Sequence, residues 1–284
     1  MVKIVTDSTS DLPKEFVQKH NITVVPLNAI FGTKSYKAGI DLTNEQFYEM
    51  LPTAKDHPTT SQPAPSDFAA VYRPLVEAGQ EIVSLHLPSK LSGTYASAVA
   101  AKNDLENHLK KAVPISIMDT PWLSMALGML VVVAAQAAEA GKSREEIVAI
   151  INAIIPKMNL IFVLDTLEYL KRGGRIGGAR ALLGTMLNVK PMLEVVNGQI
   201  EPLEQPRSRA KALRRLIEIL EQRADRKKPL HIGVLHAMDP EEAAILEKQI
   251  KSRYQCKEFY TTEIGSVLGV HTGPNAVGLA FYSD

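Results

Sequence analysis

The stretch Glu81-Ile82-Val83-Ser84-Leu85-His86-Leu87, with Pro88-Ser89-Lys90 and Leu91-Ser92-Gly93-Thr94-Tyr95-Ala96-Ser97-Ala98 after it, decides the fold class. Its first part is an apolar run that predicts a buried strand. Its last part begins a polar-apolar pattern that predicts a helix through Leu109. A strand that leads through a short linker into a helix is typical of a parallel α/β sheet. Ser92 and Gly93 are therefore expected at the carboxyl edge of that sheet, where such folds bind ligands.

Two interpretations of Ser92 remain open from the local sequence. Gly93 would let a ligand approach the backbone closely. The free amides of a helix start, beside the hydroxyls of Ser92 and Thr94, suit an anion. Alternatively, Ser92 only caps the helix.

Outward from this stretch, alternating strand and helix patterns continue to about residue 155. They predict a parallel sheet that helices cover on both faces. Within this part, residues 22–30 are expected to form one strand. The pattern changes at Pro156-Lys157-Met158-Asn159. We therefore predict an N-terminal parallel α/β domain, residues 1–157, and a C-terminal α+β domain, residues 158–284.

The second half combines strands and helices in a less regular order. Asn197-Gly198 is a strong hairpin signal between two strands. Residues 179–187 are expected to form a short apolar helix. The glycine-rich stretch Lys171-Arg172-Gly173-Gly174-Arg175-Ile176-Gly177-Gly178 either wraps an anion or ends a helix with a tight turn. It is not a Walker loop, because no Gly-Lys-Ser/Thr follows.

Residues 122–138 are almost wholly apolar but too short to span a bilayer, which needs roughly 20 residues. We expect a helix that is buried on all sides, with Thr120 as its N-cap and Pro121 in its first turn. Such a helix packs in a plain core or forms a wall of a cavity for an apolar ligand.

Composition narrows the function classes. The chain has 284 residues, a formal net charge of +1 and one cysteine. Nothing in this charge balance favours nucleic-acid binding. An internal disulfide is excluded, and without a visible signal peptide the cytoplasm is the expected compartment. No cysteine pair or His-Glu-x-x-His stretch suggests a metal site.

His271 lies among glycines in a predicted turn, where a core histidine would be unusual. It can donate a hydrogen bond to an anion or act as a base. Ser92 and His271 could thus be a hydrolase pair, but Ser92 lies outside any Gly-x-Ser-x-Gly elbow and no acidic partner of the histidine is evident. A serine and a histidine around an oxyanion would equally hold a carboxylate.

Five stretches together resemble the DegV family. They are Thr6-Asp7-Ser8-Thr9-Ser10-Asp11, Thr60-Ser61-Gln62-Pro63, Leu91-Ser92-Gly93-Thr94-Tyr95, Leu170-Lys171-Arg172-Gly173-Gly174-Arg175-Ile176 and His271-Thr272-Gly273-Pro274. They occur in family order and span nearly the whole chain. The resemblance implies a non-catalytic fatty-acid-binding protein with a ligand tunnel between two domains and no cofactor besides the bound acid. It further implies a carrier role in phospholipid metabolism, in which a separate dihydroxyacetone-kinase-like subunit, a fatty acid kinase, converts the presented carboxylate into an acyl phosphate.

The same resemblance implies roles for individual residues. The carboxylate would be bound by Thr60, Ser61, Ser92, Gly93, His271 and Thr272. The phosphate or the partner surface would be served by Arg172, Arg175 and Arg207. Residues 122–138 then become a candidate tunnel wall, and bulky substitutions at Ala126 or Gly128 are expected to shorten the preferred acyl chain. A lipid-directed hydrolase that uses Ser92 and His271, and a regulatory protein whose lipid is incidental, remain the alternatives.

Overall fold

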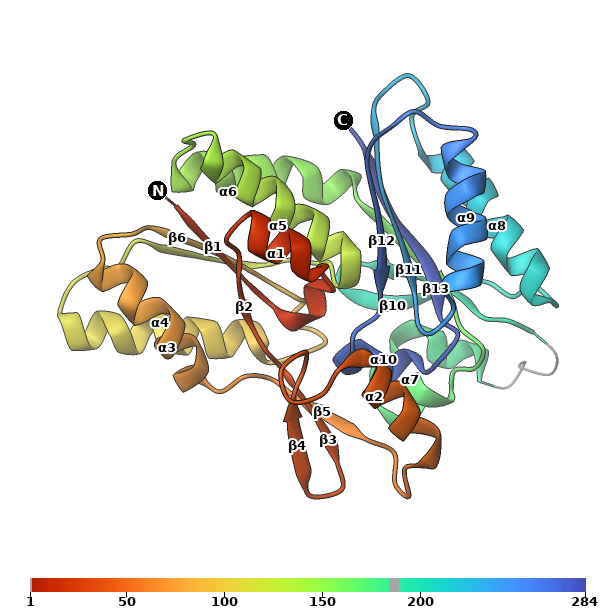
Figure 1. Ribbon diagram of the computed structural model, residues 1–284, viewed down its shortest axis with the longest axis horizontal. Helices are drawn as coiled ribbons and strands as arrows, with labels where there is room; N and C mark the ends of the chain where they lie inside the picture. The colour runs from red at the N-terminus through yellow and green to blue at the C-terminus, as the bar shows by residue number, and fades with distance from the viewer. Residues whose placement is uncertain (1, 184–188) are drawn as a thin grey trace.

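The computed structural model describes residues 2–183 and 189–284 (Figure 1). Its first main sheet has the strand order β2 (Thr23–Val25), β1 (Lys3–Asp7), β6 (Ile82–His86) and β7 (Ile115–Asp119). All of its pairings are parallel, and every residue of β6 is buried. Continuous burial is expected where helices cover both faces of a sheet. The predicted parallel α/β arrangement is therefore confirmed for this half.

Helices cover both faces of this sheet, as Figure 1 shows. One face carries α3 (Pro65–Glu77) and α4 (Thr94–Leu109), and the other carries α1 (Lys14–Lys19), α5 (Ser124–Glu139) and α6 (Arg144–Ile154). Phe68 and Tyr72 of α3 pack with Ile82 and Ala98 in a fully buried cluster. The 3-10 turns η1 (Ser8–Ser10) and η3 (Ile155–Lys157) follow β1 and α6.

A small antiparallel sheet projects from this half. Its strand order is β4 (Lys34–Lys37), β3 (Asn28–Phe31) and β5 (Thr59–Ser61), and α2 (Asn44–Met50) with η2 (Leu51–Thr53) connects β4 to β5. The prediction of one strand over residues 22–30 is wrong, because β2 and β3 belong to different sheets. Pro26 cannot donate to a ladder, and the Leu27 amide donates to Ser8 Oγ (3.0 Å) instead of to a strand.

The second main sheet contains every strand from residue 159 onward in the described chain. Its order is β10 (Gln199–Glu204), β9 (Met192–Val196), β8 (Asn159–Val163), β13 (Val277–Ser283), β11 (Leu230–His236) and β12 (Cys256–Glu263). Only β11 and β12 pair in parallel. One face is covered by α8 (Arg209–Arg223) and α9 (Pro240–Lys251). The expected α+β character is therefore observed.

Shorter elements complete the second half. They are α7 (Glu168–Arg172), the 3-10 helix η4 (Gly177–Leu182) and α10 (Ser266–Thr272). The hairpin at Asn197-Gly198 is confirmed, with both residues at positive φ. The predicted helix over 179–187 is observed only in part, as η4, and its residues 184–187 lie outside the described residues.

Helix α5 lies between the two main sheets and contacts β1, β6, β11 and β13. Twelve of its residues are buried, so the prediction of an all-round buried helix is confirmed. Its predicted start is wrong, because the helix begins at Ser124 and Thr120 is no cap. The Thr120 hydroxyl donates instead to the His86 carbonyl (2.8 Å) at the end of β6. Within residues 2–183 and 189–284, no helix combines the length and hydropathy that a membrane crossing requires.

Candidate functional site

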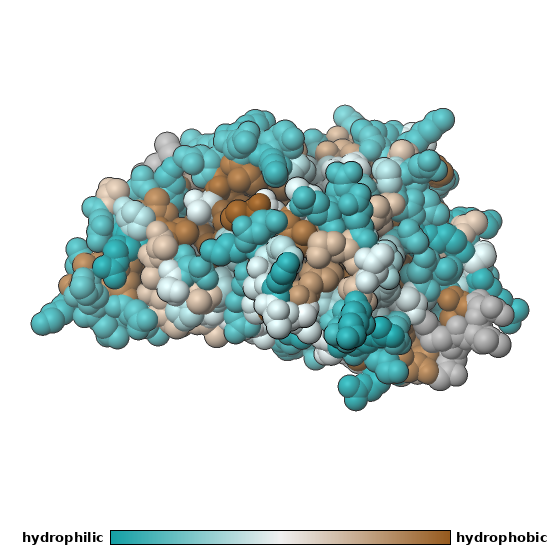
Figure 2. Space-filling view, turned by 60° about the horizontal axis from the view of Figure 1, so that its bottom comes forward, coloured by the Kyte–Doolittle hydropathy of each residue, from teal (hydrophilic) through white to brown (hydrophobic). Residues whose placement is uncertain are grey.

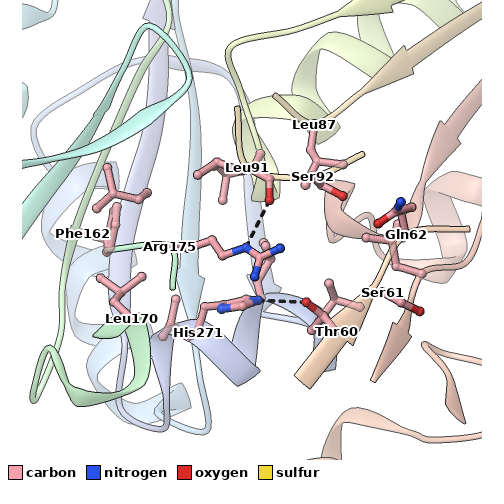
Figure 3. Close-up of a pocket in the computed structure, with 16 residues that line it drawn as sticks. Thr60, Ser61, Gln62, Leu87, Leu91, Ser92, Phe162, Leu170, Arg175 and His271 are labelled. Carbon is pink, nitrogen blue, oxygen red and sulfur yellow. Dashed lines mark hydrogen bonds between the residues drawn. The ribbon is translucent and has the colours of Figure 1, made fainter. Parts of the chain in front are cut away.

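A cavity lies where the carboxyl end of β6, the small sheet and the second half of the chain meet (Figure 3). It encloses about 660 Å³ of empty space, which includes solvent at its mouth. Nine of its lining residues are apolar: Leu27, Leu87, Leu91, Leu123, Phe162, Leu170, Ile200, Val267 and Leu268. The others are Thr60, Ser61, Gln62, Ser92, Arg175, His271 and Thr272. An apolar wall with a few convergent polar groups is the usual composition of a small-molecule site.

Thr60 and His271 meet in this cavity from opposite ends of the chain. Strand β5 carries Thr60 and α10 carries His271, and Thr60 Oγ1 lies 3.0 Å from His271 Nε2. His271 Nδ1 is buried and has no hydrogen-bond partner in the described structure. Burial, followed by the positive charges of Arg175 and His57, lowers the pKa of His271 to about 4. The imidazole is therefore neutral at neutral pH.

Ser92 lines the cavity at the turn between β6 and α4, as the sequence predicts. Its Oγ lies 2.9 Å from Thr94 Oγ1 and accepts a hydrogen bond from the Thr94 amide at 3.3 Å. Ser92 is therefore not the cap of α4, although its hydroxyl contacts the helix start and it lines the cavity. Gly93 is the N-cap residue of α4 and adjoins the lining.

The three predicted arginines are not brought together. Arg175 lines the cavity, and its guanidinium donates to the carbonyls of Leu91 (3.2 Å) and Gly173 (2.9 Å). Arg172 is exposed and pairs with Glu168 at 2.7 Å. Arg207 is exposed beyond the end of β10. Neither of these two lines the cavity.

The tunnel-wall prediction for residues 122–138 is largely wrong. Leu123, just before α5, lines the cavity, whereas Ala126 and Gly128 do not. A Cβ on Gly128 would lie 2.6 Å from the carbonyl oxygen of Ser10. Gly128 therefore permits close packing of α5 on η1 and does not shape the cavity.

Ser92 and His271 do not form a nucleophile-base pair in the described structure. The hydrogen bonds of Ser92 go to Thr94, and His271 bonds to Thr60 without an acidic partner on Nδ1. A general base has to lie within hydrogen-bond reach of the hydroxyl that it activates.

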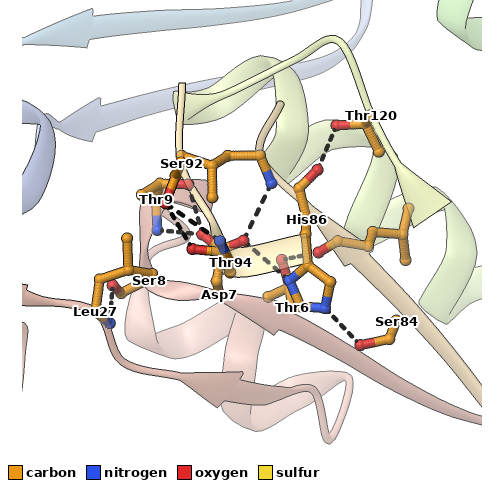
Figure 4. A network of polar contacts seen from close by, with 12 residues as sticks. Thr6, Asp7, Ser8, Thr9, Leu27, Ser84, His86, Ser92, Thr94 and Thr120 are labelled. Atoms are coloured by element: carbon orange, nitrogen blue, oxygen red, sulfur yellow. Dashed lines mark hydrogen bonds and ion pairs between the residues drawn. The ribbon is translucent and has the colours of Figure 1, made fainter. Parts of the chain in front are cut away.

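A serine, a histidine and an aspartate are linked elsewhere, at Ser84, His86 and Asp7 (Figure 4). Ser84 Oγ lies 2.7 Å from His86 Nε2, and His86 Nδ1 lies 3.0 Å from Asp7 Oδ2. Tyr72 donates to Ser84 Oγ at 2.7 Å, and the Leu87 amide donates to Asp7 at 3.1 Å. All three residues of the series are completely buried. We assign this network to the support of the sheet edge, because no substrate can reach Ser84.

Sequence reasoning missed most of the cavity wall. The apolar residues come from at least four separate segments, and nothing local distinguishes Phe162 or Ile200 from ordinary core residues. Gln62 belongs to the stretch Thr60-Ser61-Gln62-Pro63, but the sequence alone assigns it no role in the site. Hydrophobic surface also reaches solvent near the middle of the face shown in Figure 2, between hydrophilic residues. No group of three potential metal ligands occurs in the part of the chain that the structure describes.

Comparisons with known proteins agree with this architecture. A DegV domain-containing protein of Streptomyces coelicolor is 40% identical, over 99% of this chain and 98% of its own. The solved structure of a DegV family protein from Thermus thermophilus, described with fatty-acid binding, superposes with a TM-score of 0.93. It is 34% identical and covers 100% of this chain and 99% of its own.

A stearic-acid-binding protein of Eubacterium ventriosum superposes with a TM-score of 0.90. It is 31% identical, with 100% of this chain and 98% of its own covered. The family described as "Uncharacterised protein, DegV family" matches residues 1–284. The chain therefore belongs to the DegV family.

Proposed function

We propose that this chain binds one long-chain fatty acid with its carboxylate in the polar part of the cavity. The observation that carries the proposal is the pairing of Thr60 with His271 in an otherwise largely apolar cavity that Ser92 also lines. Solved relatives that bind fatty acids support it. Ser61, Gly93 and Thr272 are proposed to complete the carboxylate site.

The physical chemistry of a fatty acid matches the two parts of the cavity. Each methylene that leaves water contributes about 0.8 kcal/mol, so the acyl chain supplies the affinity. A buried carboxylate without donors would be strongly disfavoured. The hydroxyls of Thr60 and Ser92 and the imidazole of His271 are uncharged donors that can meet both of its oxygens.

We further propose that the chain is a non-catalytic carrier and that a separate kinase subunit, similar to dihydroxyacetone kinases, phosphorylates the carboxylate. Arg175 at the cavity, with Arg172 and Arg207 on exposed surface, would contact the phosphate or the partner. The division of the two main sheets supports domains at 1–157 and 158–284, with the acid between them. The single cysteine supports a cytoplasmic location.

Mass spectrometry of the organic extract from gently purified protein tests the binding proposal. One fatty acid near one per chain is expected, and Ser92→Ala and His271→Ala should reduce its amount while the fold is kept. Ser252→Ala, an exposed serine at the end of α9, is the control. A folded sample without lipid would contradict the proposal.

A second experiment tests the kinase step. The lipid-loaded chain is mixed with ATP and a candidate dihydroxyacetone-kinase-like subunit, and acyl phosphate is trapped with hydroxylamine. Acyl phosphate that forms only with both proteins present supports the carrier role. Ester hydrolysis by the chain alone that disappears in Ser92→Ala would instead revive the hydrolase. If partner binding is the same with and without lipid, the lipid is incidental and the protein is regulatory.

A further inference from the structure

Gln62 follows β5 directly and lines the mouth of the cavity beside Thr60 and Ser61. Its side chain is exposed, whereas those of Thr60 and Ser61 are partly buried. Figure 3 shows the amide group extending toward Ser92. It has no hydrogen-bond partner within the part of the chain that the structure describes. Its two N–H donors are therefore available at the opening of a site whose other side-chain donors are hydroxyls, the His271 imidazole and the Arg175 guanidinium.

The Gln62 amide lies close to the backbone of Gly93, in the space that a side chain at this position would occupy. An ideal Cβ on Gly93 would lie 2.7 Å from Gln62 Nε2 and 3.0 Å from Gln62 Cδ. The φ angle of Gly93 is −76°, which alanine adopts without strain. Backbone conformation therefore does not require glycine here. The three heavy atoms nearest to such a Cβ all belong to the Gln62 amide.

We propose that Gln62 binds the carboxylate head group of the bound acid. Gly93, which has no side chain, leaves the space that the Gln62 amide occupies. The amide donates to the carboxylate oxygen that faces the mouth, while the Thr60–His271 pair serves the inner oxygen. This inference rests on the proposed fatty-acid function and adds a residue that discriminates between head groups. A neutral amide at this position can donate a hydrogen bond to an anionic head group, whereas a carboxylate in its place would repel the anion.

Calorimetric titration with dodecanoate and with 1-dodecanol tests the proposal, because the two ligands share an acyl chain and differ in charge. Gln62→Ala should weaken dodecanoate binding by roughly tenfold, the range for a hydrogen bond to a charged group. It should weaken dodecanol binding much less. Gln62→Glu should enlarge that difference, and Gln222→Glu, on exposed α8, is the control with the same charge change.

A double-mutant cycle tests whether Gly93 acts through Gln62. Gly93→Ala should weaken dodecanoate binding in the unsubstituted chain but add little in Gln62→Ala, because the amide that it displaces is gone. Fully additive losses would overturn the role of Gly93. Unchanged dodecanoate affinity in both Gln62 variants, or equal losses for acid and alcohol, would overturn the role of Gln62 alone. Failure of the unsubstituted chain to bind dodecanoate would overturn the proposed function itself.

Discussion

Thr60 Oγ1 and His271 Nε2 lie 3.0 Å apart although 211 residues separate them in sequence. One group comes from an edge strand of the small sheet and the other from the short helix α10. This contact brings the two halves of the chain together at the cavity. It also leaves the imidazole paired with a hydroxyl on Nε2, while Nδ1 has no carboxylate partner in the described structure.

Dodecanoate binding should be accompanied by proton uptake at mildly acidic pH. The pKa of His271 is lowered to about 4, mainly by burial, so the imidazole is neutral at mildly acidic pH. A carboxylate beside it favours the imidazolium and raises this pKa. Titration calorimetry in buffers of different ionisation enthalpy should detect proton uptake at about pH 6 that vanishes at about pH 8. His271→Gln should abolish it, and proton release would contradict the contact.

Asp11→Asn should stabilise the protein above neutral pH. Burial raises the pKa of Asp11 to about 7, while Ser124 Oγ and the Gly265 amide bond to its oxygens. Because the unfolded carboxyl ionises near pH 4, the free energy of unfolding should fall as pH rises from about 4 to about 7, by about 2–4 kcal/mol. Asparagine does not ionise: its Oδ1 can accept from the Gly265 amide, and its Nδ2 can donate to Ser124 Oγ, so the direction of the second bond is reversed.

Urea denaturation at about pH 5 and about pH 8 measures this change in the free energy of unfolding. Exposed Asp104 on α4 offers the control substitution Asp104→Asn. If Asp11→Asn and the parent chain lose stability in parallel as pH rises, the carboxyl is already ionised in the fold and the prediction is wrong.

The network around Asp7 should matter for stability in a graded way. Asp7→Ala removes the acceptor of His86 and of the Leu87 amide in a dry interior, and should cost about 3–5 kcal/mol. Tyr72→Phe removes one donor at its far end and should cost about 1 kcal/mol. Thermal denaturation distinguishes the two. Equal effects would show that the bonds do not act as the structure indicates.

Gly128→Ala should destabilise the chain without changing acyl-chain preference. The new Cβ would lie only 2.6 Å from the carbonyl oxygen of Ser10. This clash should cost about 1–3 kcal/mol of stability. Leu123→Phe, which enlarges a cavity-lining side chain, should instead favour shorter acids. Competition between acids of different length measures both. A shift in preference for Gly128→Ala would return this face of α5 to the cavity wall.

Local patterns were sufficient for most of the first sheet and for the hairpin. The strand before Ser92 is apolar throughout because both of its faces are buried, and Asn197-Gly198 adopts the positive φ angles that its turn requires. Local patterns failed at residues 22–30, where an apolar run passes from one sheet to another at Pro26. Apolar character predicts burial, but it does not identify the sheet to which a residue belongs.

The polar part of the site was accessible from motifs, whereas the cavity was not. Ser92, Thr60 and His271 all line the cavity, and each lies in a stretch that resembles the DegV family, although His271 lies on α10 and not in the predicted turn. Phe162 and Ile200 carry no such signal, because a cavity-lining side chain and a core side chain have the same chemistry. Only the packing of the two halves distinguishes them. The same limit explains why α5 was interpreted as a wall when it is mostly core.

The position of α10 in the chain has a consequence for biosynthesis. Thr60 and Ser92 are made early, but His271, which completes the polar group, lies close to the carboxyl terminus. Strand β13, at the centre of the second sheet, is made later still. A growing chain that has reached Ser92 therefore lacks both His271 and the central strand of the second sheet. The cavity can form only after β13 has been synthesised.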